Sequence, residues 1–322
     1  MPKINEKYIY FFEVEDEDRK KVLETFPDAV IFREPFSDTN TDKCKDAEIL
    51  CGMIHSEFTA DNLKKLPNLK MITTRTVGYD HIDLKWADEN EIPVCNVPDY
   101  GSHVIAEHVF ALLLASIRHV LEGEEKTENE EFTWKGLRGI GLKGKTLGII
   151  GTGKIGLHVC RIASLGFLMN VIAYDPYPNE EKAMDYHFTY VDSLDDIWEK
   201  SDIITLHMPL FPETKHMINT ETISKMKNGV VLINTARGGL INTPDLINGI
   251  KEGKFKEVAL DVTEHEDNIK EDKELIHLPG VIITPHIAFY ADDSVDKMYS
   301  EAINSMKRFM DDEKLIHQVH GH

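Results

Sequence analysis

Short apolar runs alternate with amphipathic segments along most of the chain. This pattern is typical of parallel β-strands joined by crossover helices. In the first hundred residues, the expected strands cover residues 8–14, 29–32, 48–51, 71–73 and 94–96, and the expected helices cover residues 18–26, 59–66 and 83–90. A second series of expected strands covers residues 146–150, 170–174, 203–207, 230–234, 257–262 and 281–284. The two series predict an α/β protein with two doubly wound parallel sheets.

The segment between the two series has a different composition. Residues 122–133 are rich in Glu and poor in apolar residues, and we expect a solvated connection there. Before it, 11 of the 14 residues from Val104 to Ile117 are apolar, so the predicted helix 102–120 must be covered on several sides. Burial within one subunit and contact with a partner chain both fit this pattern. Because of the second possibility, we expect a homodimer formed through the region 102–120.

Composition and charge narrow the class of protein. The length of 322 residues is typical of two domains. Asp and Glu exceed Lys and Arg by 56 to 36, and the net charge of −20 disfavours nucleic acid and anionic membranes as partners. No apolar run reaches the roughly 20 residues of a membrane span. Four cysteines without a CxxC pair predict a reduced, cytoplasmic protein, and no metal-ligand spacing predicts a metal site.

A glycine motif follows the first strand of the second series. Gly151, Gly153 and Gly156 form a GxGxxG pattern between the apolar residues 147–150 and a predicted helix 154–165. The first glycine permits a tight turn, the second allows the backbone to approach a pyrophosphate, and the third allows the helix to pack closely on the strand. The helix N-terminus attracts the anionic bridge of a dinucleotide. The context of strand, turn and helix therefore predicts a dinucleotide site.

An acidic residue indicates which dinucleotide is bound. Asp175 stands nineteen residues after Gly156, at the end of the next expected strand, where a carboxylate can accept hydrogen bonds from the adenosine ribose. The same carboxylate would repel the 2′-phosphate of NADP, and no arginine follows it directly. The sequence therefore predicts NAD as the cofactor.

Seven segments together resemble the D-isomer-specific 2-hydroxyacid dehydrogenase family, and they occur in the order of that family. They are residues 75–83, 96–108, 151–156, 206–210, 234–239, 260–266 and 284–290. Within the family, Tyr100 and the segments 190–196, 217–226 and 288–290 are most similar to D-lactate dehydrogenases. The resemblance implies a Rossmann-type NAD-binding domain, residues 102–289, inserted into a flavodoxin-like substrate domain, residues 1–101 plus 290–322.

The resemblance also implies a reaction and the residues that perform it. The reaction is reversible hydride transfer between NADH and the C2 carbonyl of a small 2-keto acid, with pyruvate and D-lactate as the favoured pair. Arg237 matches the family's substrate-binding arginine, whose planar side chain suits a carboxylate. His286 matches the acid/base that exchanges a proton with the substrate oxygen. Glu266 matches the carboxylate that orients this imidazole and favours its charged form.

Further positions are assigned by the same matching. The backbone N–H groups of Val77 and Gly78 would assist the substrate carboxylate, and Tyr100 would form a wall of the pocket. The cofactor would be lined, besides the three glycines, by Lys154, Ile155, Asp175, Met208, Pro209, Thr214, Thr235, Ala236 and Asp261, of which Asp261 would lie near the nicotinamide.

Two alternatives remain open from the sequence. The same chemistry could act on glyoxylate, hydroxypyruvate or a branched 2-keto acid, because the sequence does not place the residues that shape the pocket. Relatives of this fold can also act as dinucleotide-sensing corepressors that bind peptides, and they can retain Arg237, Glu266 and His286. Activity against a panel of 2-keto acids distinguishes these possibilities.

Overall fold

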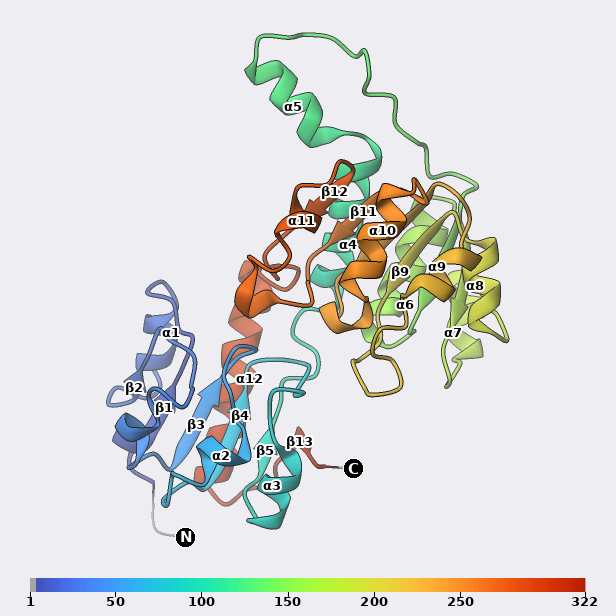
Figure 1. Cartoon of the computed structure of the whole chain (residues 1–322). Coiled ribbons are helices and arrows are strands. Elements are labelled where there is room, and N and C mark those ends of the chain that lie inside the picture. Colours follow the sequence, from blue (N-terminus) through green and yellow to red (C-terminus); the bar gives the residue numbers. More distant parts are fainter. Residues whose placement is uncertain (1–3, 322) are drawn as a thin grey trace. The chain divides into compact units, whose positions relative to one another are not determined.

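The computed structural model describes residues 4–321 and divides into two compact units. Unit 1 comprises Met1–Tyr100 and Ala291–His322, and unit 2 comprises Gly101–Tyr290 (Figure 1). Unit 2 is therefore inserted into the sequence of unit 1. The expected boundaries, after residues 101 and 289, fall one residue from these.

Unit 1 contains a six-stranded sheet in the order β13-β5-β4-β3-β1-β2. Its strands are β1 (Ile9–Phe11), β2 (Val30–Ile31), β3 (Ile49–Gly52), β4 (Met71–Thr74), β5 (Val94–Cys95) and β13 (Gln318–Val319). The first five pair in parallel, in the flavodoxin-like order, and β13 pairs antiparallel with β5. The α-helices of this unit are α1 (Arg19–Leu23), α2 (Ala60–Leu63), α3 (Leu84–Glu89) and α12 (Asp292–Met310).

A buried arginine joins the carboxyl ends of two strands in unit 1. Arg75 directly follows β4 and is fully buried. Its Nη2 donates hydrogen bonds to the carbonyl oxygens of Phe12 at 2.7 Å and Glu13 at 2.8 Å, just beyond β1. Its guanidinium also lies 4.6 Å from the centre of the Tyr299 ring on α12. These contacts fix the start of the loop that carries Val77 and Gly78.

Unit 2 contains a seven-stranded parallel sheet in the order β12-β11-β10-β9-β6-β7-β8. Its strands are β6 (Thr146–Ile150), β7 (Asn170–Tyr174), β8 (Thr189–Tyr190), β9 (Ile203–Leu206), β10 (Val230–Asn234), β11 (Phe255–Leu260) and β12 (Val281–Ile283). Counted from β6, this is the strand order of the dinucleotide-binding fold with one additional strand. The strand order reverses between β6 and β9, where such folds bind their ligands. The predicted fold class is confirmed.

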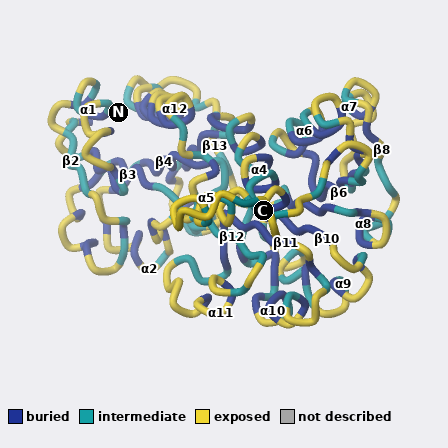
Figure 2. Tube along the Cα trace, turned by 90° about the horizontal axis from the view of Figure 1, so that it is seen from above, coloured by how far each residue is buried: buried dark blue, intermediate teal, exposed yellow. Residues whose placement is uncertain are grey.

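Both faces of the second sheet are covered, which explains why its strands are apolar without alternation. Leu147, Ile149 and Ile233 belong to a core on one face, whereas Ile150 and Leu232 belong to a core on the other face. Figure 2 shows β6, β10 and β11 as largely buried segments, whereas β8 and β12, at the edges of the sheet, are less buried. The α-helices are α4 (Ser102–Ile117), α5 (Val120–Glu128), α6 (Lys154–Arg161), α7 (Glu180–Tyr186), α8 (Leu194–Lys200), α9 (Thr220–Lys225), α10 (Thr243–Lys251) and α11 (Lys273–Ile276).

The apolar helix predicted over residues 102–120 is interrupted. Helix α4 ends at Ile117, and His119 adopts a left-handed conformation with φ of 50° before α5 begins. Nine of the 16 residues of α4 are buried, and six of these belong to the same core as residues of β6 and β10. Burial within its own unit therefore accounts for most of the apolar surface of α4.

The solvated connection expected over residues 122–133 is wrong for its first half, which belongs to α5. None of the residues of α5 is buried, so the segment is solvated but helical. Low apolar content argues against burial and not against helix formation, since Glu and Lys have high helix propensity. Among the described residues, no single helix is long and apolar enough to cross a membrane, and α4 and α5 meet that criterion only as a pair bent by 58°.

Candidate active site

The glycine turn after β6 has the geometry that the motif predicts. Gly151 has φ of +93°, and a Cβ there would lie 2.6 Å from the carbonyl oxygen of His207, so only glycine fits. A Cβ on Gly156 would lie 2.1 Å from the carbonyl oxygen of Gly151, which explains the close packing of α6 on the turn. A Cβ on Gly153 would meet nothing within 4 Å. The space beside Gly153 is therefore open to a ligand.

The N-terminus of α6 is suited to hold an anion. Gly153 is its N-cap and offers no side-chain hydrogen bond. Gly153 and Lys154 are exposed, and Ile155 is half-buried. The first N–H groups of a helix have no partner within it, and they carry partial positive charge. The open space and these donors fit the pyrophosphate of a dinucleotide.

The carboxylate of Asp175 is held beside the glycine turn. Asp175 follows β7, and its Oδ2 accepts hydrogen bonds from the backbone N–H of Thr152 at 2.6 Å and from the Thr152 hydroxyl at 3.0 Å. Its Oδ1 accepts one from the backbone N–H of Tyr177 at 2.8 Å. Because β6 and β7 are adjacent strands, the predicted acidic residue lies next to the predicted glycines.

The remaining predicted cofactor residues follow β9 and β10. Met208 and Pro209 continue from β9, and Thr214 Oγ1 donates to the carbonyl oxygen of Pro209 at 2.9 Å, which closes the loop. Thr235 and Ala236 follow β10, and the hydroxyl of Thr235 is buried without a hydrogen-bond partner. A buried polar group of this kind is normally satisfied, so a ligand that supplies a partner fits here.

Arg237 directly follows Thr235 and Ala236 and lies at the same carboxyl edge of the sheet. Its backbone carbonyl accepts a hydrogen bond from Asn234 Nδ2 at 2.8 Å, and its own Nη1 donates to the Ala236 carbonyl oxygen at 2.8 Å. The following Gly238 has no room for a side chain, because a Cβ would lie 1.8 Å from the carbonyl oxygen of Thr263. Arg237 is half-buried at the carboxyl end of β10.

His286 and Glu266 form a hydrogen-bonded pair. Nδ1 of His286 lies 2.8 Å from Oε2 of Glu266, and the two side chains are 18% and 27% exposed. Glu266 comes from the loop after β11 and His286 from the loop after β12, which are adjacent strands. The pairing engages Nδ1, and Nε2 is the ring nitrogen that remains for proton exchange. This arrangement can exchange a proton with a bound oxygen atom.

Neighbouring titratable residues have other partners. Glu264 pairs with Nε2 of His216 at 2.5 Å, and His265 pairs with Asp272 at 2.9 Å. The His216 pair and hydrogen bonds from Thr243 outweigh burial and lower the pKa of Glu264. Within the acidic run 264–267, the resemblance selects Glu266, and in the structure this residue contacts His286.

The carboxylate of Asp261 holds the loop that carries His286. Its Oδ1 accepts from Thr284 Oγ1 at 2.5 Å and from the Ile287 N–H at 2.9 Å, and its Oδ2 accepts from the Ala288 N–H at 2.8 Å. Burial raises the pKa of Asp261, but these hydrogen bonds and a contact with His108 outweigh it and lower that pKa. The Asp261 carboxylate therefore holds the Thr284 side chain before His286 and the backbone directly after it.

Sequence reasoning missed His108 and Thr284 as members of this network. Nε2 of His108, on α4, lies 3.2 Å from Thr284 Oγ1 and 3.4 Å from Oδ1 of Asp261. Both residues lie within the segments that resemble the family, and that membership is the signal that could have identified them.

Three predicted substrate-binding residues lie in unit 1. The carbonyl oxygen of Val77 accepts from Asn96 Nδ2 at 2.7 Å, and that of Gly78 accepts from Thr76 Oγ1 at 2.5 Å. These bonds turn the carbonyl groups inward and order the loop after β4. Tyr100, the last residue of the first segment of unit 1, is buried. The structure thus assembles Arg237, Glu266 and His286 within unit 2 and places Val77, Gly78 and Tyr100 in the other unit.

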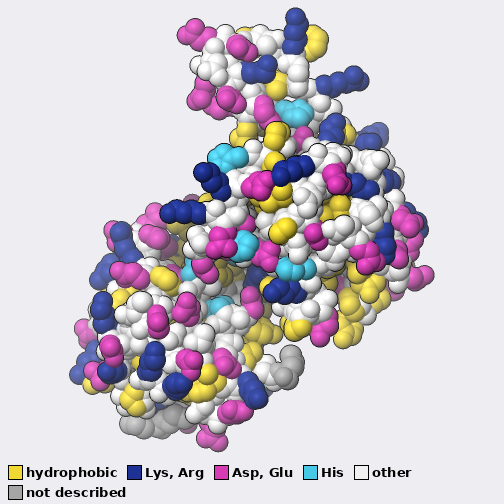
Figure 3. Space-filling model, viewed as in Figure 1, with side chains coloured by type: hydrophobic (Ala, Val, Ile, Leu, Met, Phe, Trp, Pro, Cys, Tyr) yellow, Lys and Arg dark blue, Asp and Glu magenta, His cyan; other side chains and the backbone are white. Residues whose placement is uncertain are grey.

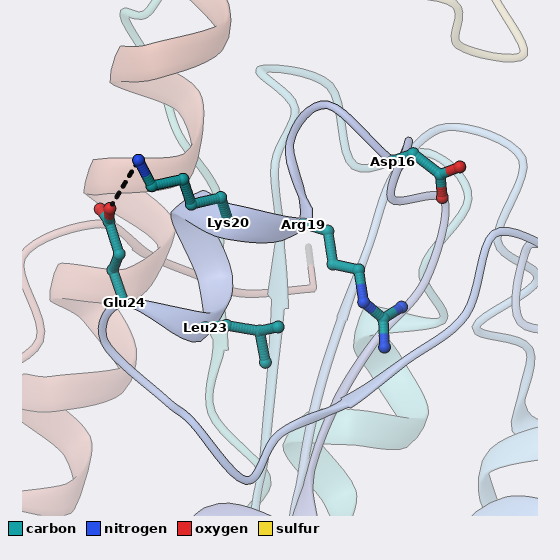
Figure 4. A pocket seen from close by; sticks show the side chains of 5 residues that line it. All are labelled: Asp16, Arg19, Lys20, Leu23 and Glu24. Atoms are coloured by element: carbon teal, nitrogen blue, oxygen red, sulfur yellow. Dashed lines mark ion pairs between the residues drawn. The ribbon is translucent and has the colours of Figure 1, made fainter.

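The surface also has features that lie outside the candidate site. A hollow beside α1 is lined by Asp16, Arg19, Lys20, Leu23 and Glu24, and it holds the exposed ion pair of Lys20 and Glu24 (Figure 4). Figure 3 shows acidic and basic side chains interspersed over the visible face. Among residues 4–321, no group of three His, Cys, Asp or Glu side chains could hold a metal ion.

Comparison with known proteins decides the family. Residues 110–288 match the model of the D-isomer specific 2-hydroxyacid dehydrogenase NAD binding domain. The chain belongs to the D-isomer-specific 2-hydroxyacid dehydrogenase family. It is an NAD-dependent oxidoreductase, and the family resemblance predicted from the sequence is confirmed, as is NAD as the cofactor. The corepressor alternative is not favoured.

Three relatives of this family show how far the similarity extends. A 2-hydroxyacid dehydrogenase homolog of Zymomonas mobilis is 38% identical over 84% of this chain and 86% of its own length. D-lactate dehydrogenase from Aquifex aeolicus, solved in complex with NAD and lactic acid, is 35% identical with a TM-score of 0.90, over 98% of this chain and 99% of that one. A D-2-hydroxyisocaproate dehydrogenase is 28% identical with a TM-score of 0.83, over 97% and 99%.

Proposed function

We propose that this dehydrogenase reduces pyruvate to D-lactate, with His286 as proton donor and Arg237 as the group that binds the substrate carboxylate. The observation that carries the proposal is the hydrogen bond between His286 and Glu266, on the same sheet edge as Arg237. The similarity to the lactate-bound enzyme of Aquifex aeolicus supports pyruvate as the substrate.

The residues of this chain have separate tasks in the proposed reaction. NADH supplies a hydride to C2 of the keto acid. The guanidinium of Arg237 binds the carboxylate through two parallel hydrogen bonds and so fixes the position of C2. Protonated His286 donates a proton to the substrate oxygen as negative charge develops there, and in the reverse direction the neutral ring removes it.

Supporting residues hold this machinery in place. Glu266 orients the His286 ring and stabilises its charged form. Asp261 positions the His286 loop, as its hydrogen bonds to residues 284–288 indicate. We assign the N–H groups of Val77 and Gly78 to the substrate carboxylate and Tyr100 to the pocket wall.

The cofactor residues form a second set in the proposal. The glycine turn and the N-terminus of α6 hold the pyrophosphate, and Asp175 holds the adenosine ribose. The set comprises Gly151, Gly153, Lys154, Ile155, Gly156, Asp175, Met208, Pro209, Thr214, Thr235, Ala236 and Asp261, the last of which would lie near the nicotinamide.

A branched 2-keto acid is the second candidate substrate, because a D-2-hydroxyisocaproate dehydrogenase is among the similar structures. The test is the loss of NADH absorbance with pyruvate, glyoxylate, hydroxypyruvate and 2-ketoisocaproate, followed by chiral analysis of the product. Pyruvate is expected to give the highest kcat/KM and the D-isomer. A higher value for another acid replaces pyruvate as the substrate, and an L-product contradicts the proposal.

Replacing Glu266 by Gln is expected to lower kcat/KM by about tenfold or more in both directions of the reaction and across the pH range, as for loss of a hydrogen bond to a charged group. Gln keeps a hydrogen-bond acceptor for Nδ1 of His286 but removes the negative charge that faces the ring. The ring is then held less firmly in the orientation that proton transfer to or from the substrate oxygen requires.

The measurement is kcat/KM against pH in both directions, with the exposed Glu271 replaced by Gln as the matched control. The control is expected to reproduce the parental profile. If Glu266→Gln does so too, Glu266 does not act on His286 in the reaction.

We further propose a homodimer. The sequence placed its interface in the region 102–120, but because most of α4 is buried in its own unit, we place the interface in the segment that follows α4. Val120 and Leu121 are each 53% exposed, and Phe132 and Trp134 are 97% and 84% exposed. Exposed apolar side chains grouped in this way mark an interaction site. A mass near twice 36.7 kDa is expected by light scattering, with dissociation when Phe132 and Trp134 are both replaced by Asp. A monomeric parent contradicts the proposal.

A cytoplasmic location is also part of the proposal. It is supported by the four cysteines, Cys44, Cys51, Cys95 and Cys160, all of which are free and buried. Free thiols persist in reducing compartments.

A further inference from the structure

A chain of hydrogen bonds ends on the carboxylate of Asp175. The backbone N–H of Asn179 donates to the Tyr190 hydroxyl at 3.1 Å, and Tyr190 Oη lies 2.8 Å from Thr152 Oγ1. The Thr152 hydroxyl donates to Asp175 Oδ2 at 3.0 Å. The ionised carboxylate only accepts hydrogen bonds. The Thr152 proton is thus directed to Asp175, and the Tyr190 proton is directed to Thr152.

Strand order brings these residues together. Thr152 lies in the turn after β6, Asp175 follows β7, and Tyr190 ends β8, and the three strands are neighbours. Thr152 is only 6% exposed, and the Tyr190 ring packs edge-on against Phe188 at 5.1 Å between centroids. Neither hydroxyl can therefore move far without disturbing its surroundings.

The chain constrains how Asp175 presents its oxygens. A carboxylate has about four acceptor positions, and Thr152 occupies two on Oδ2 while Tyr177 occupies one on Oδ1. Bonds to a charged acceptor are short and strong, and linked hydrogen bonds reinforce one another. The free position on Oδ1 is consequently held in one orientation before any cofactor binds.

We propose that Thr152 and Tyr190 are positioning residues that fix Asp175 for the adenosine ribose and so contribute to the preference for NADH over NADPH. Neither residue belongs to the set assigned to the cofactor from the family resemblance. A carboxylate held in place favours a ribose hydroxyl and repels a 2′-phosphate, whereas a carboxylate free to rotate away does both less effectively. The proposal rests on NAD binding and is independent of which keto acid is reduced.

The test measures binding of NADH and of NADPH to the full chain by fluorescence titration. Thr152→Val removes the hydroxyl with almost no change of volume, and we expect Kd for NADH to rise about tenfold, as for loss of a hydrogen bond to a charged group. Tyr190→Phe is expected to raise it about threefold. Kd for NADPH is expected to rise less or to fall, so the ratio of the two constants decreases in both variants.

Two controls separate positioning from folding. Thr152→Ser keeps the hydroxyl and is expected to restore the parental Kd within about twofold. Thr189→Val makes the same substitution at an exposed threonine next to Tyr190. It is expected to leave the Kd values for NADH and NADPH unchanged. The thermal midpoint of each variant without cofactor shows whether it is folded.

The outcomes are decisive in either direction. A parental Kd for NADH in Thr152→Val overturns the proposal, and so does an equal loss of affinity for NADH and NADPH. A Ser variant as weak as the Val variant also overturns it, since the hydroxyl is then not the active feature. If Thr152→Val does not fold, Tyr190→Phe decides by the same ratio of constants. Because no keto acid is present in the titration, these results do not depend on the substrate proposed above.

Discussion

Replacing His286 by Gln is expected to lower kcat/KM for pyruvate by about 10²- to 10⁴-fold, the usual contribution of a positioned general acid. Gln can still donate a hydrogen bond, but it cannot deliver a proton to the substrate oxygen as charge develops there. The Nδ1 hydrogen bond to Glu266 and the backbone bond from His286 N to the Asp261 carbonyl oxygen at 2.8 Å hold the ring in place. The structure thus presents an oriented acid, and the loss falls on the chemical step.

Steady-state kinetics and NADH titration together check this prediction. The Kd for NADH is expected to stay within about twofold of the parent, because His286 is not among the proposed cofactor residues. The matched control is His277→Gln, which changes an exposed residue at the C-terminal end of α11. This control is expected to have the kinetics of the parent. Parental turnover of His286→Gln would require another proton donor. His207 is a poor candidate, because desolvation lowers its pKa well below the ordinary value.

Replacing Arg237 by Lys is expected to lower kcat/KM for pyruvate by about 10- to 100-fold, although the positive charge is kept. A planar guanidinium binds a carboxylate through two parallel hydrogen bonds, whereas an ammonium group is a point charge on a flexible stem. Asn234 Nδ2 fixes the Arg237 backbone and so directs the base of this side chain. Looser binding of the carboxylate leaves C2 less well placed for hydride transfer.

The kinetic signature of this variant is a higher KM together with a lower kcat. Arg19→Lys, an exposed change on α1, is the matched control and is expected to behave as the parent. Near-parental kinetics of Arg237→Lys would show that another group holds the substrate carboxylate.

Much of the fold follows from local pattern. The strands of unit 2 were predictable because burial on both faces makes each strand a continuous apolar run, as in residues 146–150 and 230–234. The strands β8 and β13 were not predicted, because Thr189–Tyr190 and Gln318–Val319 do not belong to an apolar run. Helix α5 was mistaken for a connection because an exposed helix leaves no apolar stripe.

The residues of the candidate site also divide into those that the sequence predicted and those that only the structure identified. The glycine residues and Asp175 were identified from spacing, because a turn, a helix start and the end of the next strand lie at fixed distances along the sequence. Arg237, Glu266 and His286 were identified only through resemblance, since a single charged residue in a loop has no local signature. Two features were found only in the tertiary structure. They are the hydrogen bonds that the Asp261 carboxylate accepts from the Ile287 and Ala288 N–H groups, and the contact between His108 and Thr284.

By itself the sequence determined that this is a two-sheet α/β protein with a dinucleotide turn after β6, because strand periodicity and turn chemistry are local properties. The tertiary structure decided which groups become partners where the sequence had assigned none: Thr152 and Tyr190 lie behind Asp175. These partners are up to 38 positions apart in sequence. Only the order of the strands in the sheet brings them within hydrogen-bond distance.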